Sequence, residues 1–369
     1  MLHIQQRLDR LRKALKEKKL DAILVSNFFN ILYLSEFKTL TENERESWLL
    51  LTADSCYVFS DNRYLDSKVL ENNFITYLLI SPENNLINYL DNIFKKERLV
   101  SCAIEEYDLK LYEFNLLKKY LQNISFIPTR QIIIRLRETK DNDEIQKIKK
   151  ACEISDDCLK EVSKIITVGM MEKEIAFKME FFIKEKGYDT SFYPIVAIDR
   201  NSAIAHYDTK INGNEKVKIG SVILIDFGVK FQNYCSDITR MFFVGQVDTQ
   251  IINTYNNLKA SQQALFQKGI VSQGKKLSDV DKYCRKLIAD YELPDYSHST
   301  GHGVGLEVHE YPKISSFSED LSKKNQVVTI EPGVYFEGKW GMRVEDTVIV
   351  NEDGLEALTK FDKEPFLIK

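Results

Sequence analysis

Four acidic residues in the C-terminal half of the chain form two pairs with the same arrangement. Asp226 and Asp237 lie in the segment VILIDFGVKFQNYCSDITRMFFV, and Glu331 and Glu345 lie in VVTIEPGVYFEGKWGMRVEDTVIV. Each acid adjoins an apolar run typical of a buried strand, and each pair flanks a segment suited to a turn. The pattern therefore predicts two β-hairpins that each carry two carboxylates.

In the first hairpin we expect the chain to turn around Phe231 and Gln232, which lie midway between the two acids. Asp226 and Asp237 would then be directly opposed residues on one face of the hairpin, with Cβ atoms about 4.5 to 5.5 Å apart. Opposed like charges destabilise a sheet, so this arrangement predicts a compensating partner for the acids.

The second hairpin is expected to turn at Gly338, which is equidistant from Glu331 and Glu345 and suits the positive φ of a tight turn. Four carboxylates would then converge. A buried carboxylate without a partner usually takes up a proton, so four together require compensating cations. Two divalent metal ions would supply the necessary positive charge.

A histidine that suits the same site, His302, lies between the two acidic pairs in the glycine-rich segment GHGVG. Glycines let the backbone approach closely, and a neutral imidazole is a common metal ligand. Four carboxylates and one histidine suit Mn²⁺, Co²⁺, Fe²⁺ or Zn²⁺ better than copper or an iron–sulfur cluster. The ligand types do not select one of these four ions, of which we expect Mn²⁺ first.

Five motifs that contain these residues resemble the ligand motifs of the pita-bread metallopeptidases, peptidase family M24. They are LIDFG, SDITR, GHGVGLEVHE, EPGVY and RVEDT, in this order. The family includes aminopeptidase P, prolidase and methionine aminopeptidase, and the resemblance runs from about Asp143 onward. The preceding residues fit the N-terminal domain of the aminopeptidase P, prolidase and creatinase branch. The resemblance implies a creatinase-like α/β domain over residues 1–130 and an α+β pita-bread catalytic domain with pseudo-two-fold halves over residues 138–369.

The resemblance also implies a ligand set for two metal ions. Its members are Asp226, Asp237, His302, Glu331 and Glu345, with Asp237 bridging both ions. Creatinase keeps the fold but lacks this set, so the complete set favours a hydrolytic metalloenzyme over a creatinase-like activity. It also argues against the non-catalytic binding relatives, which have typically lost ligands.

Further residues are assigned to the substrate by the same resemblance. His206, in AIAHYDT, and His309, in EVHEYP, match positions that face the substrate in similar peptidases. His298 either lines the pocket or satisfies a hydrogen bond in the core, and both interpretations stay open. Lys313 follows HEYP, where prolidases of similar layout often place an arginine that holds the C-terminal carboxylate of the substrate.

The expected chemistry is peptide hydrolysis by a hydroxide that bridges the two metals, since bound divalent ions lower the pKa of water to about 7. Glu331 would carry a proton to the leaving nitrogen, and His206 and His309 would donate hydrogen bonds to the tetrahedral intermediate. Thr239 and Arg343 each lie two residues from a ligand on the same strand face. They would either brace the ligand carboxylates or form ordinary cross-strand pairs.

The branch with this N-terminal domain cleaves the bond between a first residue and a following proline. We expect an Xaa-Pro aminopeptidase, because Lys313 is a point charge without the bidentate fork of arginine. An Xaa-Pro dipeptidase (prolidase) is the alternative. A non-catalytic, metal-stabilised peptide-binding protein is the alternative of another class, because Asp199, Arg200 and Ala205 depart from the family pattern in the loop that bears His206.

Composition sets the remaining expectations. The 369 residues are 44% hydrophobic with a net charge of −4, which gives no electrostatic reason to expect nucleic acid. The charged start MLHIQQRLDRLRKALKEKKL and the lack of an 18-residue apolar stretch predict neither secretion nor membrane insertion. Six cysteines without C-x-x-C spacing indicate reduced thiols in a cytoplasmic protein. Two-domain relatives are commonly dimers, so a homodimer is expected.

The N-terminal region alternates between helix and strand patterns. We expect an amphipathic helix with Leu8, Leu11 and Leu15, strands at residues 21–26, 47–54, 56–60, 74–80 and 98–104, a polar helical stretch between the third and fourth strands, and helices near residues 83–96 and after the fifth strand. The boundary between the two domains is expected near residues 127–137. Beyond it, helical spacing joins Ile145, Ile148, Cys152, Leu159 and Val162.

Overall fold

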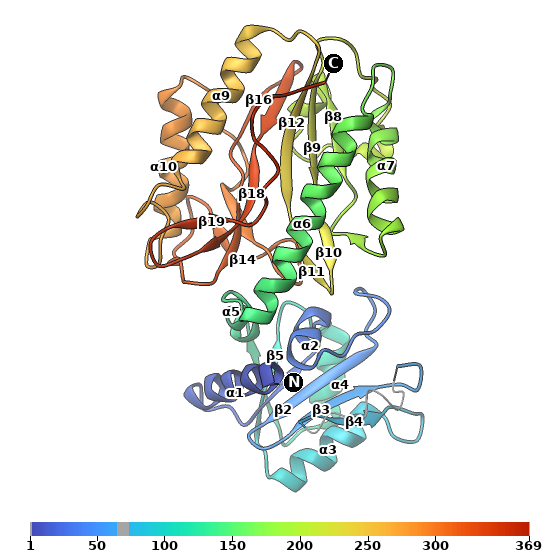
Figure 1. The fold of residues 1–369 in the computed structure, drawn as a ribbon. Helices are drawn as coiled ribbons and strands as arrows, with labels where there is room; N and C mark the ends of the chain where they lie inside the picture. The colour runs from blue at the N-terminus through green and yellow to red at the C-terminus, as the bar shows by residue number, and fades with distance from the viewer. Residues whose placement is uncertain (1, 65–73, 369) are drawn as a thin grey trace. The chain divides into compact units, whose positions relative to one another are not determined.

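The computed structural model describes residues 2–64 and 74–368, and the chain forms two compact units, Met1–Arg137 and Glu138–Lys369 (Figure 1). Within the described ranges, no helix is long and apolar enough to cross a lipid bilayer. The polar helical stretch expected after the third strand falls largely on residues 65–73, which lie outside the described residues.

The first unit is a six-stranded sheet with helices packed on it. Its strands are β1 (Ala22–Val25), β2 (Ser47–Thr52), β3 (Cys56–Ser60), β4 (Thr76–Leu79), β5 (Ser101–Glu105) and β6 (Ser125–Thr129), in the spatial order β4-β3-β2-β1-β5-β6. Its helices are α1 (Leu2–Glu17), α2 (Phe28–Ser35), α3 (Leu86–Glu97), α4 (Leu111–Tyr120) and α5 (Ile132–Arg137). The expected α/β layered domain is confirmed.

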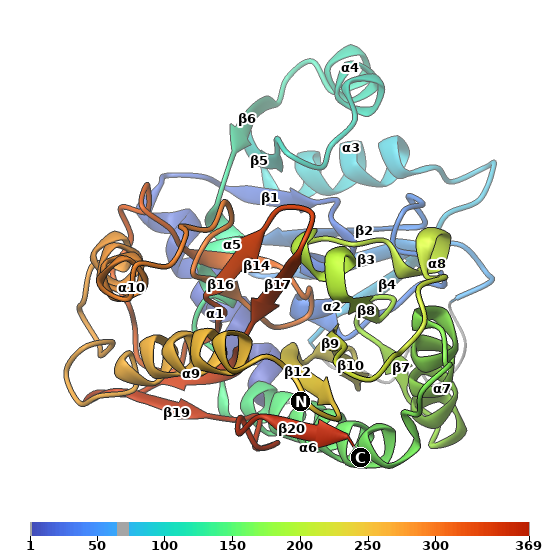
Figure 2. The same cartoon turned by 90° about the horizontal axis from the view of Figure 1, so that it is seen from above.

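Hydrophobic periodicity explains this packing. Leu8, Leu11 and Leu15 recur on one face of α1 and are buried, as their spacing predicts. Helices α3 and α4 bury Phe94 and Leu117 in one core with apolar residues of β1, β2, β3 and β5 (Figure 2). Every residue of β1 and β2 is buried, so both faces of these strands are covered.

The second unit is built on a nine-stranded sheet. Its helices are α6 (Asn142–Ile165), α7 (Glu172–Glu185), the 3₁₀ helix η2 (Asp199–Ala203), α8 (Thr209–Asn212), α9 (Thr249–Ala264) and α10 (Leu277–Asp290). Its strands are β7 (Asp189–Thr190), β8 (Ile195–Ile198), β9 (Val222–Phe227), β10 (Val229–Phe231), β11 (Tyr234–Cys235), β12 (Ile238–Val244), β13 (Gly301–Gly303), β14 (Glu310–Ile314), β15 (Val327–Ile330), β16 (Gly333–Phe336), β17 (Trp340–Arg343), β18 (Glu345–Val350), β19 (Leu355–Ala357) and β20 (Phe366–Ile368). The main strand order is β14-β13-β15-β18-β12-β9-β8.

This unit has two halves of similar construction. Helices α6 and α7 share a core with β8, β9 and β12, whereas residues in and around α9 and α10 share a core with β14, β15 and β18 (Figure 1). Strands β12 and β18 join the halves. The expected α+β pita-bread fold with pseudo-two-fold halves is therefore confirmed.

Helix α6 begins with a capping box. The Asp141 carboxylate accepts a hydrogen bond from the Glu144 backbone N–H at 2.9 Å, and the Glu144 carboxylate accepts one from the Asp141 N–H at 2.9 Å. This reciprocal capping satisfies backbone donors that the first turn leaves unpaired. The apolar residues expected at helical spacing, from Ile145 to Val162, are all buried.

The predicted register of the first acidic hairpin is wrong. The turn residues Gln232 and Asn233 both have positive φ, 46° and 71°, so the turn is centred between them rather than between Phe231 and Gln232. Asp226 therefore pairs with Thr239 and not with Asp237. Because side chains alternate along a strand, this shift of the partner by two residues leaves both acids on the same face.

The predicted register of the second acidic hairpin is confirmed. Strands β16 and β17 form a hairpin with Gly333 opposite Arg343, and Gly338 at its turn has a φ of 70° (Figure 2). Beyond the acids, Ile330 pairs with Asp346 in the same register. Glu331 and Glu345 thus occupy corresponding positions between two consistent ladders.

Candidate metal centre

The structure brings all five predicted ligands together. Atoms suited to metal binding lie within 4.8 Å of one another in three overlapping groups. The groups are Asp226, Asp237 and Glu345; His302, Glu331 and Glu345; and Asp237, His302 and His309. Since Glu345, Asp237 and His302 each belong to two groups, the ligands form one continuous cluster with room for more than one ion.

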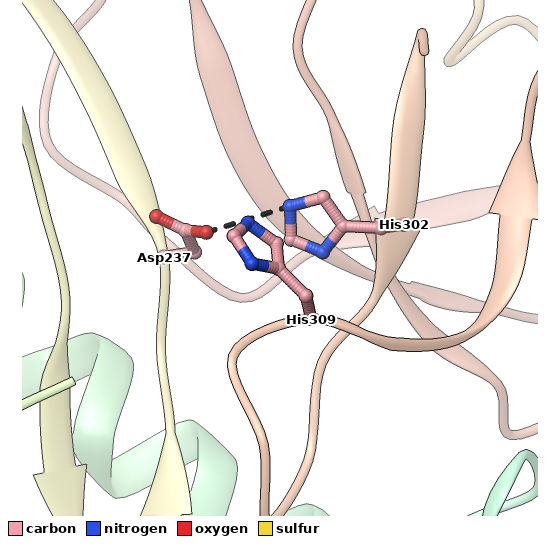
Figure 3. A group of neighbouring side chains, drawn as sticks. All are labelled: Asp237, His302 and His309. Carbon is pink, nitrogen blue, oxygen red and sulfur yellow. Dashed lines mark ion pairs between the residues drawn. The ribbon is translucent and has the colours of Figure 1, made fainter. Parts of the chain in front are cut away.

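His302 is oriented toward the acids by its backbone surroundings. Its Nδ1 lies 3.1 Å from the Gly303 carbonyl oxygen. If the neutral ring donates its Nδ1 proton to this carbonyl, the lone pair of Nε2 is free to bind a metal ion. That Nε2 lies 3.6 Å from Asp237 Oδ2 (Figure 3). It also lies 3.4 Å from Glu331 Oε1. The imidazole therefore faces one acid from each hairpin.

The glycines beside His302 permit this position. A Cβ atom at Gly301 would lie 2.0 Å from the Thr329 carbonyl oxygen, and one at Gly303 would lie 2.2 Å from the Tyr311 carbonyl oxygen. Such distances are not possible for real side chains, so β13 fits between its neighbours only with glycine at both positions. The expectation of close backbone approach is confirmed.

The acidic cluster is short of hydrogen-bond donors. Among the described residues, the buried Oδ1 atoms of Asp226 and Asp237 have no hydrogen-bond partner. Burial and the nearby Glu345 carboxylate raise the pKa of Asp237 well above its ordinary value. Burial and Glu331 likewise raise the pKa of Glu345, and burial raises that of Glu331 to about 7. Bound cations would coordinate the unpartnered oxygens and offset the repulsion between the carboxylates. The donor set therefore fits divalent metal ions.

Arg343 and Thr239 brace the acids. Arg343 donates from Nη2 to Asp226 Oδ2 and from Nε to Thr239 Oγ1 at 3.2 Å, and Thr239 Oγ1 donates to Glu345 Oε2 at 2.7 Å. One guanidinium thus orders a carboxylate from each hairpin. A single positive charge leaves most of the negative charge of the cluster uncompensated.

The pKa shifts of these carboxyls predict how pH changes the stability of the metal-free protein. Between pH 6.5 and 8, carboxyls whose folded pKa values are raised hold more protons in the folded than in the unfolded state, so stability falls as pH rises. Burial lowers the pKa of His302 to about 3, which costs stability only below the ordinary histidine value of 6.5. Thermal unfolding in a chelator should give a lower Tm at pH 8 than at pH 6.5, because the free energy of unfolding falls by up to about 1.4 kcal/mol per pH unit for each carboxyl.

Asp237→Asn removes one of the shifted carboxyls and should flatten this dependence. A Tm that is equal or higher at pH 8 in the metal-free wild type would contradict the prediction.

The predicted substrate residues lie in different surroundings. His309 is exposed, and its ring stacks edge-on against His302 with centroids 4.4 Å apart (Figure 3). His298 is half-buried, bonded through Nε2 to the Tyr335 hydroxyl at 2.9 Å, with its Nδ1 4.0 Å from Glu331 Oε2. Lys313 is exposed and pairs with His302 in the β13–β14 ladder. The structure thus brings these three residues next to the ligand cluster.

The loop that bears His206 is held by residues the family pattern did not predict. Asp199, with a φ of 50°, accepts hydrogen bonds from the Ser221 hydroxyl at 3.1 Å and the Val222 N–H at 2.9 Å. The backbone carbonyl before His206, that of Ala205, accepts from Arg343 at 3.2 Å. His206 itself is exposed. The unusual Asp199 is therefore bonded into the sheet, and the loop is tied to the arginine that braces Asp226.

A buried carboxylate that sequence reasoning missed organises the same loop. Glu172 is fully buried and accepts from the Ile198 N–H at 2.7 Å, the Asn201 amide at 2.9 Å and the Tyr207 hydroxyl at 2.9 Å. Ile198 and Asn201 precede His206 in the chain, and Tyr207 follows it. All three lie far from Glu172 in sequence, so no local pattern joins them to it. The helical charge pattern at the start of α7 gave no reason to single it out.

Tyr335 was missed as well. Its hydroxyl accepts from Arg343 Nη1 at 2.9 Å and bonds His298, which links the arginine beside Asp226 to a predicted substrate residue. The signal was present, because Tyr335 belongs to the EPGVY motif, where only the glutamate was assigned a role.

Comparisons with known proteins show the family to which the chain belongs. Residues 146–352 match the metallopeptidase family M24, and residues 7–139 match the creatinase/prolidase N-terminal domain. The Xaa-Pro dipeptidase of Pyrococcus horikoshii is 29% identical over 368 residues, which cover 98% of this chain and 99% of that protein.

Two solved structures extend the comparison. The Xaa-Pro dipeptidase from Bacillus anthracis aligns with a TM-score of 0.91 at 28% identity, covering 99% of this chain and 100% of that one. The X-Pro aminopeptidase from Thermotoga maritima aligns with a TM-score of 0.86 at 30% identity, covering 95% and 99%. Because the family match spans both halves of the sheet that brings the acids and His302 together, this chain belongs to metallopeptidase family M24 and carries the N-terminal domain shared by creatinase and prolidase.

Proposed function

We propose that this chain is an Xaa-Pro aminopeptidase, a hydrolase that removes a first residue preceding proline with the aid of two divalent metal ions. The proposal is carried by the convergence of four carboxylates and His302. Two buried oxygens of these carboxylates, Oδ1 of Asp226 and of Asp237, have no hydrogen-bond partner within the described residues. The ligands would be Asp226, Asp237, His302, Glu331 and Glu345. The catalytic domain would be residues 138–369, with a creatinase-like domain at residues 1–130.

Two divalent ions bound there supply Lewis-acid polarisation of the scissile carbonyl and a water that is ionised near neutral pH. Among the protein groups, Glu331 is proposed to move a proton toward the leaving nitrogen, because a carboxyl group placed at the reacting atoms can act as a general acid and base. His206 and His309 are proposed to donate hydrogen bonds to charge that develops on the substrate. Thr239 and Arg343 keep the ligand carboxylates oriented.

His298 and Lys313 are proposed to contact the substrate. Burial lowers the pKa of His298 to about 4, so it is neutral at pH 7 and acts as a hydrogen-bonding group rather than a cation. Lys313 is exposed beside the ligand strand β13, where its ammonium can reach the carboxylate of a bound peptide. As a point charge it orients such a group less strictly than an arginine would.

An Xaa-Pro dipeptidase is the second candidate. Two full-length relatives, from Pyrococcus horikoshii and Bacillus anthracis, carry that name, whereas the Thermotoga maritima relative is named an X-Pro aminopeptidase. Both activities require the same ligand set and differ in how the end of the substrate is held.

Substrate length separates the two candidates. We expect the protein with added Mn²⁺ to release the first residue from Xaa-Pro-Yaa peptides faster than from Xaa-Pro, and Lys313→Met to leave the tripeptide reaction within about twofold. If instead Xaa-Pro is preferred, Xaa-Pro-amide is poor, and Lys313→Met raises KM for Xaa-Pro about tenfold, the dipeptidase is correct; such a loss corresponds to about 1.4 kcal/mol. No turnover of either length with Mn²⁺, Co²⁺ or Zn²⁺ would leave the peptide-binding alternative.

Three finer properties are also proposals. Mn²⁺ is our first choice among the ions that suit oxygen-rich sites with one imidazole, and metal analysis of the purified protein tests it. A homodimer and a cytoplasmic location follow from the resemblance and from the reduced cysteines. Light scattering and fractionation of cells would test them.

A further inference from the structure

The two halves of the nine-stranded sheet meet at a short joint. Between β12 and β18 the backbone ladder registers Ile238 with Asp346 and Thr239 with Glu345. The four proposed carboxylate ligands are divided between the two sides of this joint, because each hairpin belongs to one half. The spacing between the two acidic pairs therefore depends on how firmly β12 and β18 are held together.

Arg240 extends this joint where the backbone ladder ends. Its side chain is buried, and Nη1 donates to the backbone carbonyl oxygens of Glu345 at 2.5 Å and Thr239 at 3.0 Å. These carbonyls belong to the last registered pair of residues. The guanidinium thus bonds the two strands where the next backbone pair of the ladder would lie. Its Nε and Nη2 also donate to the Phe361 carbonyl oxygen at 3.0 and 2.8 Å.

Asp346 anchors the guanidinium. This fully buried carboxylate accepts through Oδ1 from Arg240 Nη2 at 2.7 Å and from the Thr359 hydroxyl at 2.9 Å. Through Oδ2 it accepts from Lys363 Nζ at 2.6 Å and from Gln262 Nε2 at 2.8 Å. Both oxygens are therefore satisfied, and the negative charge has two cationic partners, as a buried carboxylate requires.

The network reaches the ligand strands through their backbones. Gln262 Nε2 also donates to the Ile330 carbonyl oxygen at 3.2 Å, immediately before Glu331. Because side chains alternate along a strand, Arg240 and Asp346 lie on the face opposite to Thr239 and Glu345. Their hydrogen bonds therefore act on the metal ligands by fixing where the strands lie.

We propose that Arg240 and Asp346 form a positioning pair that holds the two acidic hairpins at the spacing required for tight binding of two metal ions. The inference rests on the proposed metal site and adds a determinant outside the ligand shell. A purely structural pair would change the Tm of the protein and leave its metal affinity unchanged in the folded state. A positioning pair must change the metal affinity.

Asp346→Asn tests the inference because the amide keeps the size of the side chain but loses its charge and one acceptor oxygen. Mn²⁺ is titrated into the metal-free full-length chain by calorimetry, well below the Tm of each variant. We expect Mn²⁺ to bind about 10- to 100-fold more weakly, the range typical of outer-shell changes. The control is Glu138→Gln, which removes a buried carboxylate paired with Lys323 at 2.8 Å outside the ligand strands and should change the affinity less than threefold.

Wild-type affinity in a folded Asp346→Asn protein would overturn the inference. If that variant does not fold, Gln262→Met serves instead, because it removes the bonds of Gln262 to Asp346, the Ile330 carbonyl and Lys363 and leaves the charge of Asp346 in place. It should weaken Mn²⁺ binding several-fold, and unchanged affinity would equally overturn the inference. A wild-type chain that binds no Mn²⁺, Co²⁺ or Zn²⁺ would instead refute the metal site itself.

Discussion

Glu331→Gln is expected to lower kcat for an Xaa-Pro peptide by about 10³, within the range by which general acid–base groups accelerate reactions. The amide keeps an oxygen that can bind a cation but cannot accept and return a proton. The KM should change far less than kcat, because the substitution acts on the transition state rather than on substrate binding.

Steady-state kinetics on protein of measured metal content check this result. Glu352→Gln is the matched control, since Glu352 is exposed and pairs with Lys324 on the surface, and its kcat should stay within twofold of wild type. A Glu331→Gln protein that retains both metal ions and more than a tenth of wild-type kcat would refute the role proposed for Glu331.

Asp237→Asn is expected to have opposite effects on metal binding and on the stability of the metal-free protein. Asp237 belongs to two of the ligand groups, so losing its charge should weaken binding of a metal pair by at least about 100-fold. In the metal-free protein at pH 8 the same change removes a carboxylate whose pKa is raised by burial and by three neighbouring acids. The new amide can donate to those acids, so the Tm should rise, by at least about 3 °C.

Calorimetric titration with Mn²⁺ and thermal unfolding with and without a chelator give the two readouts. Wild type should gain stability when metal is added, whereas Asp237→Asn should gain almost none. Asp157→Asn, on the exposed surface of α6, should change neither quantity. A lower Tm for metal-free Asp237→Asn would show that Asp237 stabilises the fold through its charge, against the expectation.

The clustering of the five proposed ligands could be predicted from sequence because each residue is marked locally. An acid beside a buried strand, a glycine with positive φ at a turn and a histidine between glycines are all patterns within a few residues, and Gly338 centres its hairpin as predicted. The helical spacing that begins α6 and the alternation of α/β elements in the first unit are marked in the same way.

The register of the first hairpin was beyond sequence reasoning because Gln232 and Asn233 both adopt positive φ without a glycine to signal it. The prediction that both acids lie on one face still holds, because side chains alternate along a strand and a partner shifted by two positions stays on the same face.

The amino-acid sequence by itself determined which side chains gather in the acidic cluster and which elements carry them, because local periodicity and turn residues mark both. The sequence placed Thr239 and Arg343 beside two of the acids, but the tertiary structure alone decided which partners hold those acids in place. Arg343 reaches Asp226 from a distant strand, Tyr335 joins it to His298, and Arg240 meets Asp346 only where the two halves of the sheet come together. Such polar partners are chosen by which faces and strand ends meet in three dimensions, and residues so far apart in the chain leave no local pattern to read.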